Sequence, residues 1–237
     1  MRAMKPAAVA SAIFAFALAT AALAQEEVAP AAAKEDAASA ASAAAQEEAP
    51  AATPEETVAE APMPKGQELF ATCSACHGET GTSMIPLYPS LAGQFPEYLI
   101  SQFLAFKNGA RQDETMQPFA DMTSEEDARE AIAWVTSQKL QPEAPEEPQD
   151  TSVGERIYRG GIMDRRIPSC AACHGPDGSG IAVQYPSLAG QHADYTIKQL
   201  TAFRDGTRTT NQPMADVAAK MNDKEIEAVA AYIARMR

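Results

Sequence analysis

Two copies of a five-residue motif contain the side chains with which this chain could perform chemistry. The motif is Cys-x-x-Cys-His, and it accounts for all four cysteines and for two of the three histidines. Thiols about one helical turn apart can bond two positions along one edge of a haem, and the histidine that follows is then held under the iron. The copies are Cys73-Ser74-Ala75-Cys76-His77 and Cys170-Ala171-Ala172-Cys173-His174.

Three other uses of the cysteines compete with haem attachment. An even number of cysteines in an exported protein ordinarily predicts disulfides. A zinc site would need a second cysteine pair within about 15–20 residues, whereas these pairs lie 97 positions apart. A redox-active Cys-x-x-Cys pair does not need the histidine that follows both copies. The spacing therefore predicts two covalently bound haem c groups, one at each motif.

The two motifs belong to a longer internal repeat. The segment Tyr-Pro-Ser-Leu-Ala-Gly-Gln at residues 88–94 recurs without change at residues 185–191, again 97 positions later. Six more pairs of identical residues share this offset: Tyr98 and Tyr195, Gln102 and Gln199, Ala105 and Ala202, Phe106 and Phe203, Gly109 and Gly206, and Arg111 and Arg208. The chain is therefore a duplicated domain, and each candidate site can be checked against its copy.

Helices are the elements that must position these motifs. Residues 97–107 place their apolar side chains close to one helical stripe. A polar cap followed by acidic residues predicts a final helix over residues 124–138 in the first copy and from residue 222 in the second. The intervening loops, residues 78–96 and 175–192, are long for such small domains unless a large group fills the space that they enclose. A haem would supply that apolar surface.

Composition divides the chain into five segments. Residues 1–24 have a basic start, an apolar run and Ala-Leu-Ala before Gln25, which predicts a signal peptide and a periplasmic protein. If this peptide were not cleaved, it would tether the protein to the membrane. Residues 25–64 contain 16 alanines, five prolines and no glycine or aromatic residue, which predicts a disordered acidic linker. A second acidic, Pro-rich linker covers residues 142–152 and separates the repeats at 65–141 and 153–237.

The formal net charge of −13 is distributed unevenly. The first repeat carries a net charge of −5 and the second a net charge of +2. This asymmetry could orient encounters with charged protein partners, or it could serve solubility alone. No basic face is evident, so nucleic-acid binding is not predicted.

The paired Cys-x-x-Cys-His-Gly motifs, the Tyr-Pro-Ser-Leu-Ala-Gly-Gln loops, the Phe-x-x-Gly-x-Arg segments and the closing helices resemble those of dihaem cytochrome c4. The resemblance covers about residues 65–237. It implies an all-α fold of two tandem cytochrome c domains related by a pseudo-twofold axis. It also implies a periplasmic carrier, not an enzyme, that passes electrons from the quinol–cytochrome c reductase side of a respiratory chain toward a terminal oxidase. The acidic N-terminal segment is not part of this pattern.

The resemblance also implies roles for individual residues. His77 and His174 would be the proximal iron ligands. The carbonyl groups of two prolines would accept the histidine ring N–H, while the leucine two positions later would pack on the haem. The residues implied are Cys73, Cys76, Pro89 and Leu91 for the first haem, and Cys170, Cys173, Pro186 and Leu188 for the second.

Each repeat contains two methionines that could be the sixth iron ligand. When the repeats are aligned on the starts of their final helices, Met116 coincides with Met214, whereas Met122 coincides with a lysine and Met221 with a threonine. Only one pair is therefore shared. We expect Met116 and Met214 to bind iron, and Met122 and Met221 to pack beside the final helices.

Two other functions are compatible with paired haems. A dihaem peroxidase needs an openable iron position and nearby acid–base groups, and His192, the one histidine outside the motifs, is more typical of a surface or loop position. A closed His/Met iron favours electron transfer over substrate binding. The stronger alternative is a dihaem electron-accepting subunit of a dehydrogenase, such as a flavocytochrome.

The second repeat contains an insertion. Gly66 precedes Cys73 by seven residues, whereas Gly154 precedes Cys170 by sixteen. The additional residues are 159–168, and we expect them near the domain interface or a haem edge.

Overall fold

The computed structural model describes residues 63–142 and 149–237, which belong to one compact unit. Apart from three isolated β-bridges, the described residues form helices and loops, which confirms the predicted all-α class. The predicted signal peptide, the first linker up to residue 62 and residues 143–148 of the second linker lie outside the described residues. Within the described ranges, no helix is both long enough and apolar enough to cross a membrane.

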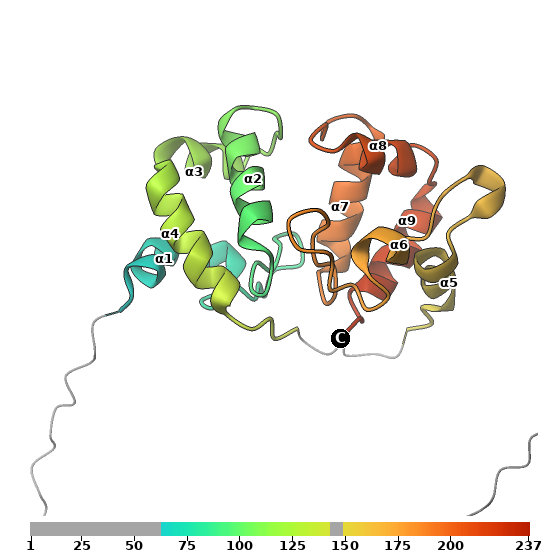
Figure 1. Cartoon of the computed structure of the whole chain (residues 1–237), viewed down its shortest axis with the longest axis horizontal. Coiled ribbons are helices and arrows are strands. Elements are labelled where there is room, and N and C mark those ends of the chain that lie inside the picture. Colours follow the sequence, from blue (N-terminus) through green and yellow to red (C-terminus); the bar gives the residue numbers. More distant parts are fainter. Residues whose placement is uncertain (1–62, 143–148) are drawn as a thin grey trace, which may run out of the picture. The chain divides into compact units, whose positions relative to one another are not determined.

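Residues 63–142 fold into four helices (Figure 1). Helix α4 contacts both α1 and α2, and α3 packs on α2. The helices are α1 (Lys65–His77), α2 (Pro96–Lys107), α3 (Met116–Met122) and α4 (Glu125–Ser137).

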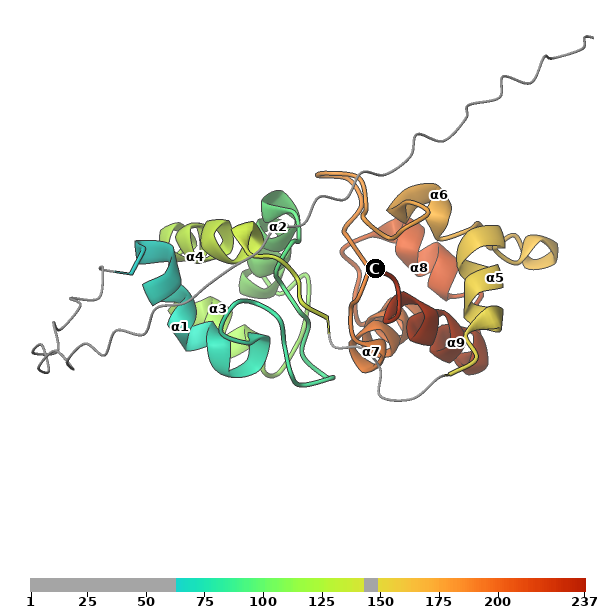
Figure 2. The same cartoon turned by 90° about the horizontal axis from the view of Figure 1, so that it is seen from below.

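Residues 149–237 repeat this arrangement, with the first helix divided into two. Helix α9 contacts α5 and α7, and α8 packs on α7; Figure 2 shows α5 and α9 side by side. The elements are α5 (Ser152–Gly160), the 3₁₀ helix η1 (Met163–Arg165), α6 (Ala171–His174), α7 (Ala193–Arg204), α8 (Gln212–Ala218) and α9 (Asp223–Ile233).

Local capping explains where the final helices begin. The Ser124 hydroxyl accepts a hydrogen bond of 3.0 Å from the backbone N–H of Asp127, and three acidic residues occupy the first turn of α4. Before α9, Asn222 and Glu225 form a capping box, with each side chain accepting a hydrogen bond from the other's backbone N–H. These caps satisfy N–H groups that the helices cannot pair internally.

The two domains differ in the size of their apolar cores. The fully buried cluster of the first domain consists of Phe70, Ala131 and Val135. The corresponding cluster of the second domain contains eight buried residues, and Tyr158 at its centre is completely buried. Because its own buried cluster is small, the stability of the first domain depends more on apolar contacts outside that cluster.

The insertion packs on its own domain. Residues 162 and 167 form a β-bridge, and the Ile167 side chain is buried in the second-domain core. Arg165 donates to the carbonyl of Lys220 and forms an ion pair with Glu225, beside the start of α9. The segment is therefore anchored to the core of its own domain, and its expected position near the domain interface stays a prediction. Its proximity to a haem edge stays a prediction.

A glycine allows the first helix of each domain to approach the last one closely. A Cβ atom added to Gly66 would lie 2.5 Å from the carbonyl oxygen of Glu130 on α4. A Cβ atom on Gly154 would overlap the carbonyl oxygen of Ala228 on α9. Since backbone cannot move aside as a flexible side chain can, both crossings require glycine.

Gly154→Ala is expected to destabilise the protein by about 1–3 kcal/mol, because the added methyl group overpacks the contact between α5 and α9. Gly160→Ala, in the same helix, is the matched control, because a Cβ atom there has no neighbour within 4 Å. Denaturant unfolding of the haem-loaded protein, followed by far-ultraviolet circular dichroism, measures both. Equal stability of the two variants would contradict the close crossing.

Candidate functional site

Both Cys-x-x-Cys-His motifs lie at the carboxyl end of helical segments. Cys73 and Cys76 are on the last turns of α1, whereas Cys170 directly precedes the short helix α6, which contains Cys173. All four cysteines are half-buried free thiols. Each pair is thus presented from about one helical turn, as attachment to one haem edge requires.

The two motif histidines are held in the same way in both domains. The Nδ1 atom of His77 lies 2.8 Å from the carbonyl oxygen of Pro89, and that of His174 lies 2.9 Å from the carbonyl oxygen of Pro186. Each of these histidines is only 6% exposed. Since a carbonyl cannot donate, Nδ1 carries the proton in each pair, and Nε2 is the nitrogen with a free lone pair.

Burial also keeps these imidazoles neutral. Desolvation lowers the pKa of both His77 and His174, and their hydrogen bonds to the proline carbonyls only partly offset this effect. A neutral imidazole with Nδ1–H donated to a carbonyl is the form that binds iron through Nε2.

A tight turn places each proline loop beside its motif. The backbone N–H groups of Leu91 and Ala92 both donate to the carbonyl of Gly81, at 2.7 and 3.0 Å. The second copy forms the same pair of bonds to the carbonyl of Gly178. Gly81 and Gly178 adopt φ values of 81° and 75°, which side chains disfavour. Leu91 and Leu188, partly buried, pack on the same clusters as Cys73 and Cys170, respectively.

The first cysteine of each motif lacks the lowered pKa of an activated redox thiol. Burial, with a smaller contribution from Cys76, raises the pKa of the Cys73 thiol. Burial likewise raises the pKa of Cys170 to about 11. Reactive thiols in Cys-x-x-Cys redox motifs have lowered pKa values, so the structure does not favour the redox interpretation.

Tyr158 supports the second motif in a way that sequence analysis missed. Its hydroxyl donates a 2.8 Å hydrogen bond to the carbonyl of Gly175, the residue after His174. This bond connects α5 to the motif across the insertion. In the first domain no such connection is needed, because α1 continues without interruption into Cys73-Ser74-Ala75-Cys76-His77. The insertion itself was therefore the only sequence signal for such a residue.

Met116 and Met214 occupy equivalent positions in the two domains. Met116 is the first residue of α3, and its backbone N–H donates to the Asp113 carboxylate. Met214 lies in the first turn of α8, and its N–H donates to the side-chain oxygen of Asn211. Both bonds are 3.0 Å long and span three residues. Both methionines are half-buried.

The other two methionines differ from each other. Met221 is 4% exposed and belongs to the second-domain core, as expected of a packing residue. Met122 is 75% exposed, so its predicted packing beside α4 is wrong. Ala120, two residues earlier on α3, is the buried residue there, and two positions along a helix lead to nearly the opposite face.

His192 lies in a loop position, directly before α7. Its Nε2 atom is 2.8 Å from the carbonyl oxygen of Ser83, a residue of the first domain. The contact identifies His192 as a half-buried residue between the two repeats.

Two buried arginines provide a further test of whether haem fits. Arg111 and Arg208 are each 6% exposed and stack on Phe106 and Phe203, at 4.5 and 4.4 Å from the ring centroids. Within the described ranges, neither guanidinium has a carboxylate partner, and Nε of Arg208 has no hydrogen-bond partner. Buried cations require a compensating anion, and the carboxylates of haem are anionic.

The residues present therefore fit haem in both domains. Each site offers two thiols on one helical turn, a neutral imidazole with a free Nε2 and an apolar leucine beside the thiols. In the described part of the chain, no group of three or more His, Cys, Asp and Glu side chains is arranged to hold a metal ion directly.

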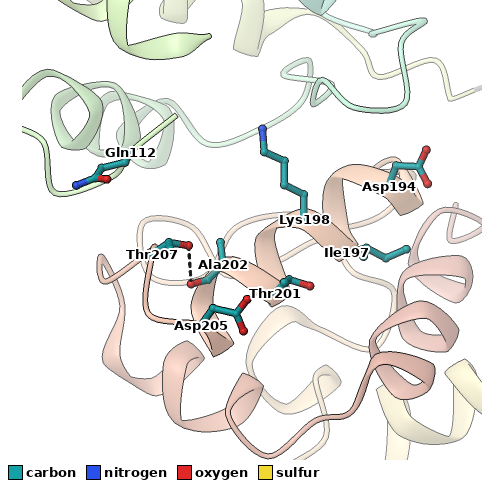
Figure 3. Close-up of a pocket in the computed structure, with 8 residues that line it drawn as sticks. All are labelled: Gln112, Asp194, Ile197, Lys198, Thr201, Ala202, Asp205 and Thr207. Atoms are coloured by element: carbon teal, nitrogen blue, oxygen red, sulfur yellow. Dashed lines mark hydrogen bonds between the residues drawn. The ribbon is translucent and has the colours of Figure 1, made fainter. Parts of the chain in front are cut away.

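A separate depression runs along α7 and contains none of the predicted site residues (Figure 3). Asp194, Lys198 and Thr207 contribute to its lining, together with Gln112 from the first domain. Lys198 also forms a 2.7 Å ion pair with Asp113. Since no cysteine or histidine of either motif lines it, the depression is not a site of haem attachment.

Comparisons with known proteins agree with this geometry. The sequence model of the cytochrome c family matches residues 63–139 and 154–237. Cytochrome c4 of Pseudomonas aeruginosa is 41% identical over 172 residues, which cover 71% of this chain and 85% of that protein. A thiosulfate dehydrogenase electron acceptor of Stutzerimonas stutzeri is 37% identical over 169 residues, covering 69% of this chain and 78% of its own.

A solved structure shows the same fold. The crystal structure of reduced recombinant cytochrome c4 from Pseudomonas stutzeri matches with a TM-score of 0.69 and 39% sequence identity, covering 73% of this chain and 97% of that one. Two domains of this kind, each with its Cys-x-x-Cys-His motif, hold two covalently bound haem c groups. The chain is an electron-transfer protein that belongs to the cytochrome c family and, within it, to the dihaem cytochromes c4.

Proposed function

We propose that this protein is an exported periplasmic carrier that passes electrons from the quinol-oxidising side of a respiratory chain to a terminal oxidase. The observation that carries the proposal is the equivalence of the two sites. In each, a buried histidine is held by a proline carbonyl, and a methionine lies at an equivalent capped position. Two similar one-electron sites in one chain suit transfer between proteins.

The chain's own residues would determine what each haem can do. Haem supplies the reversible one-electron chemistry of its iron. The cysteine pairs hold the group in place, and Pro89 and Pro186 orient the imidazoles of His77 and His174.

A methionine as the sixth ligand of each iron would complete this assignment of roles. Met116 and Met214 would close the remaining side of each iron. Closure by methionine raises the potential and excludes small substrates, which favours a carrier over a peroxidase.

A second candidate function is electron acceptance within a dehydrogenase system. The 37% identical relative from Stutzerimonas stutzeri is a thiosulfate dehydrogenase electron acceptor, so the same pair of domains serves such a role elsewhere. In that case the donor would be a dehydrogenase of the periplasm, not the quinol-oxidising side of the chain.

Stopped-flow reduction distinguishes the two functions. Quinol–cytochrome c reductase is expected to reduce the oxidised protein faster than thiosulfate dehydrogenase supplied with thiosulfate. A terminal oxidase should then reoxidise it. Absorbance of the reduced haems reports both steps, and raising the ionic strength tests whether charge steers the encounter. Faster reduction by the dehydrogenase would establish the second function instead.

Changing Cys73 and Cys76 together to Ala is expected to remove one of the two covalent haems and to destabilise residues 65–141, because the fully buried core of that domain is small. A haemochrome assay on acid-acetone-extracted protein measures the remaining haem. Ser74→Ala, between the two thiols, is the control and should retain both. Haem that extracts freely from the unaltered protein would refute covalent attachment.

Met116→Leu and Met214→Leu should each remove about half of the methionine-to-iron charge-transfer absorption of the oxidised protein, because each is expected to bind one of two irons. Each should also open one iron to carbon monoxide or cyanide and lower its potential.

Met122→Leu and Met221→Leu are the matched controls for this ligand assignment. Both should leave the absorption band intact, and Met221→Leu should cost less than about 1.5 kcal/mol of stability, because the volume is nearly conserved. Loss of the band in a control variant would reverse the assignment in that domain.

A further inference from the structure

Two glutamines connect the domains through the loops that hold the motif histidines. The Gln191 side chain accepts a 3.1 Å hydrogen bond from the Ser90 N–H and donates one of 2.9 Å to the Ser90 carbonyl. Reciprocally, Gln94 accepts a 3.0 Å bond from the Ser187 N–H and donates one of 2.9 Å to the Ser187 carbonyl. Each glutamine thus binds both backbone groups of one serine in the other repeat.

These serines follow the prolines that hold the histidines. The N–H of Ser90 and the carbonyl of Pro89 belong to one peptide unit. Its carbonyl oxygen lies 2.8 Å from Nδ1 of His77, while its N–H donates to Gln191 of the second domain. A single peptide bond therefore separates the buried imidazole of one domain from a side chain of the other. The peptide between Pro186 and Ser187 relates His174 to Gln94 in the same way.

Each glutamine side chain is also held by a hydrogen bond within its own domain. The Gln191 side-chain oxygen also accepts the N–H of His192 at 3.1 Å, and that of Gln94 accepts the N–H of Phe95 at 3.0 Å. His192 and Phe95 cap α7 and α2. Each acceptor is therefore anchored to the start of a helix. Ser90, which Gln191 contacts, is buried, and Ser187, which Gln94 contacts, is half-buried.

The peptide unit can transmit polarisation because its C–N bond is partly double. An acceptor on its N–H increases the negative charge on its carbonyl oxygen, since consecutive hydrogen bonds polarise one another. A more negative carbonyl draws the Nδ1 proton more strongly and makes the imidazole a more basic ligand. A more basic ligand stabilises oxidised iron over reduced iron, which lowers the reduction potential.

We propose that Gln191 lowers the reduction potential of the first haem and that Gln94 lowers that of the second, each acting across the domain boundary through one peptide bond. Both are positioning residues. The inference rests on the proposed ligation of iron by His77 and His174. It extends the proposed carrier function, because the reduction potential of each haem then depends on whether the other domain is docked.

The test is Gln191→Leu in the full haem-loaded protein, which keeps side-chain bulk and removes the amide. Midpoint potentials are measured by spectroelectrochemical titration with small mediators, and nuclear magnetic resonance assigns each haem to its domain. We expect the potential of the first haem to rise and that of the second to change little. Gln94→Leu should raise the second haem's potential instead.

Two further variants separate this effect from loss of docking or folding. Tyr195→Phe removes a different cross-domain hydrogen bond, the one that the Tyr195 hydroxyl accepts from Arg111 at 2.8 Å, and should leave both potentials unchanged. Gln191→Glu retains an acceptor for the Ser90 N–H and adds negative charge, so it should lower the potential of the first haem. Faster hydrogen exchange at the Ser90 amide in Gln191→Leu would confirm that the intended bond was removed.

The proposal is overturned if Gln191→Leu changes the reduction potential of the haem in its own domain, changes both potentials equally, or changes neither. It is also overturned if Tyr195→Phe produces the same shift. The potentials are measured without a protein partner. Failure of the proposed carrier function would therefore appear in the stopped-flow rates, and the measured potentials could still be interpreted. Retention of a low-spin spectrum shows that iron ligation itself persists.

Discussion

The hydrogen bond from a buried histidine to a proline carbonyl is the constraint on which each domain depends. It fixes the imidazole at its Nδ1 atom and leaves Nε2 for iron. The loop that supplies the carbonyl can reach the motif only through the turn at Gly81 or Gly178, where φ is positive. The apolar leucine of the same loop then lies beside a motif cysteine. One loop therefore positions ligand, thiol and apolar contact together.

The two domains reach this arrangement by different means. In the first, one helix runs unbroken from Gly66 through the motif, and the fully buried core is small. In the second, the insertion interrupts that helix, and Tyr158 and Ile167 restore the connection from a larger core. The haem-binding geometry is thus repeated while its supporting structure is not. The first domain should consequently gain more of its stability from the haem.

Reciprocal contacts between the domains explain why certain residues are identical in the two repeats. Arg111 hydrogen-bonds to Tyr195 and Gln199, and Arg208 hydrogen-bonds to Tyr98 and Gln102. In a twofold interface, each contact occurs twice, so the same residue is required in both copies. The identical tyrosine, glutamine and arginine pairs of the repeats are therefore interface residues as much as domain residues.

The sequence by itself determined the two haem sites, the duplication, the helical class and the shared methionine pair, because covalent attachment and helix capping depend on spacing over a few residues. Tertiary structure decided the exposure of Met122 and the burial of Ile167 beneath α9. It also decided that Gln94 and Gln191 bind the opposite domain. Identity between repeats marks a residue as required but does not specify its partner. Burial and cross-domain hydrogen bonds join residues about 100 positions apart, and only packing of the whole unit brings them together.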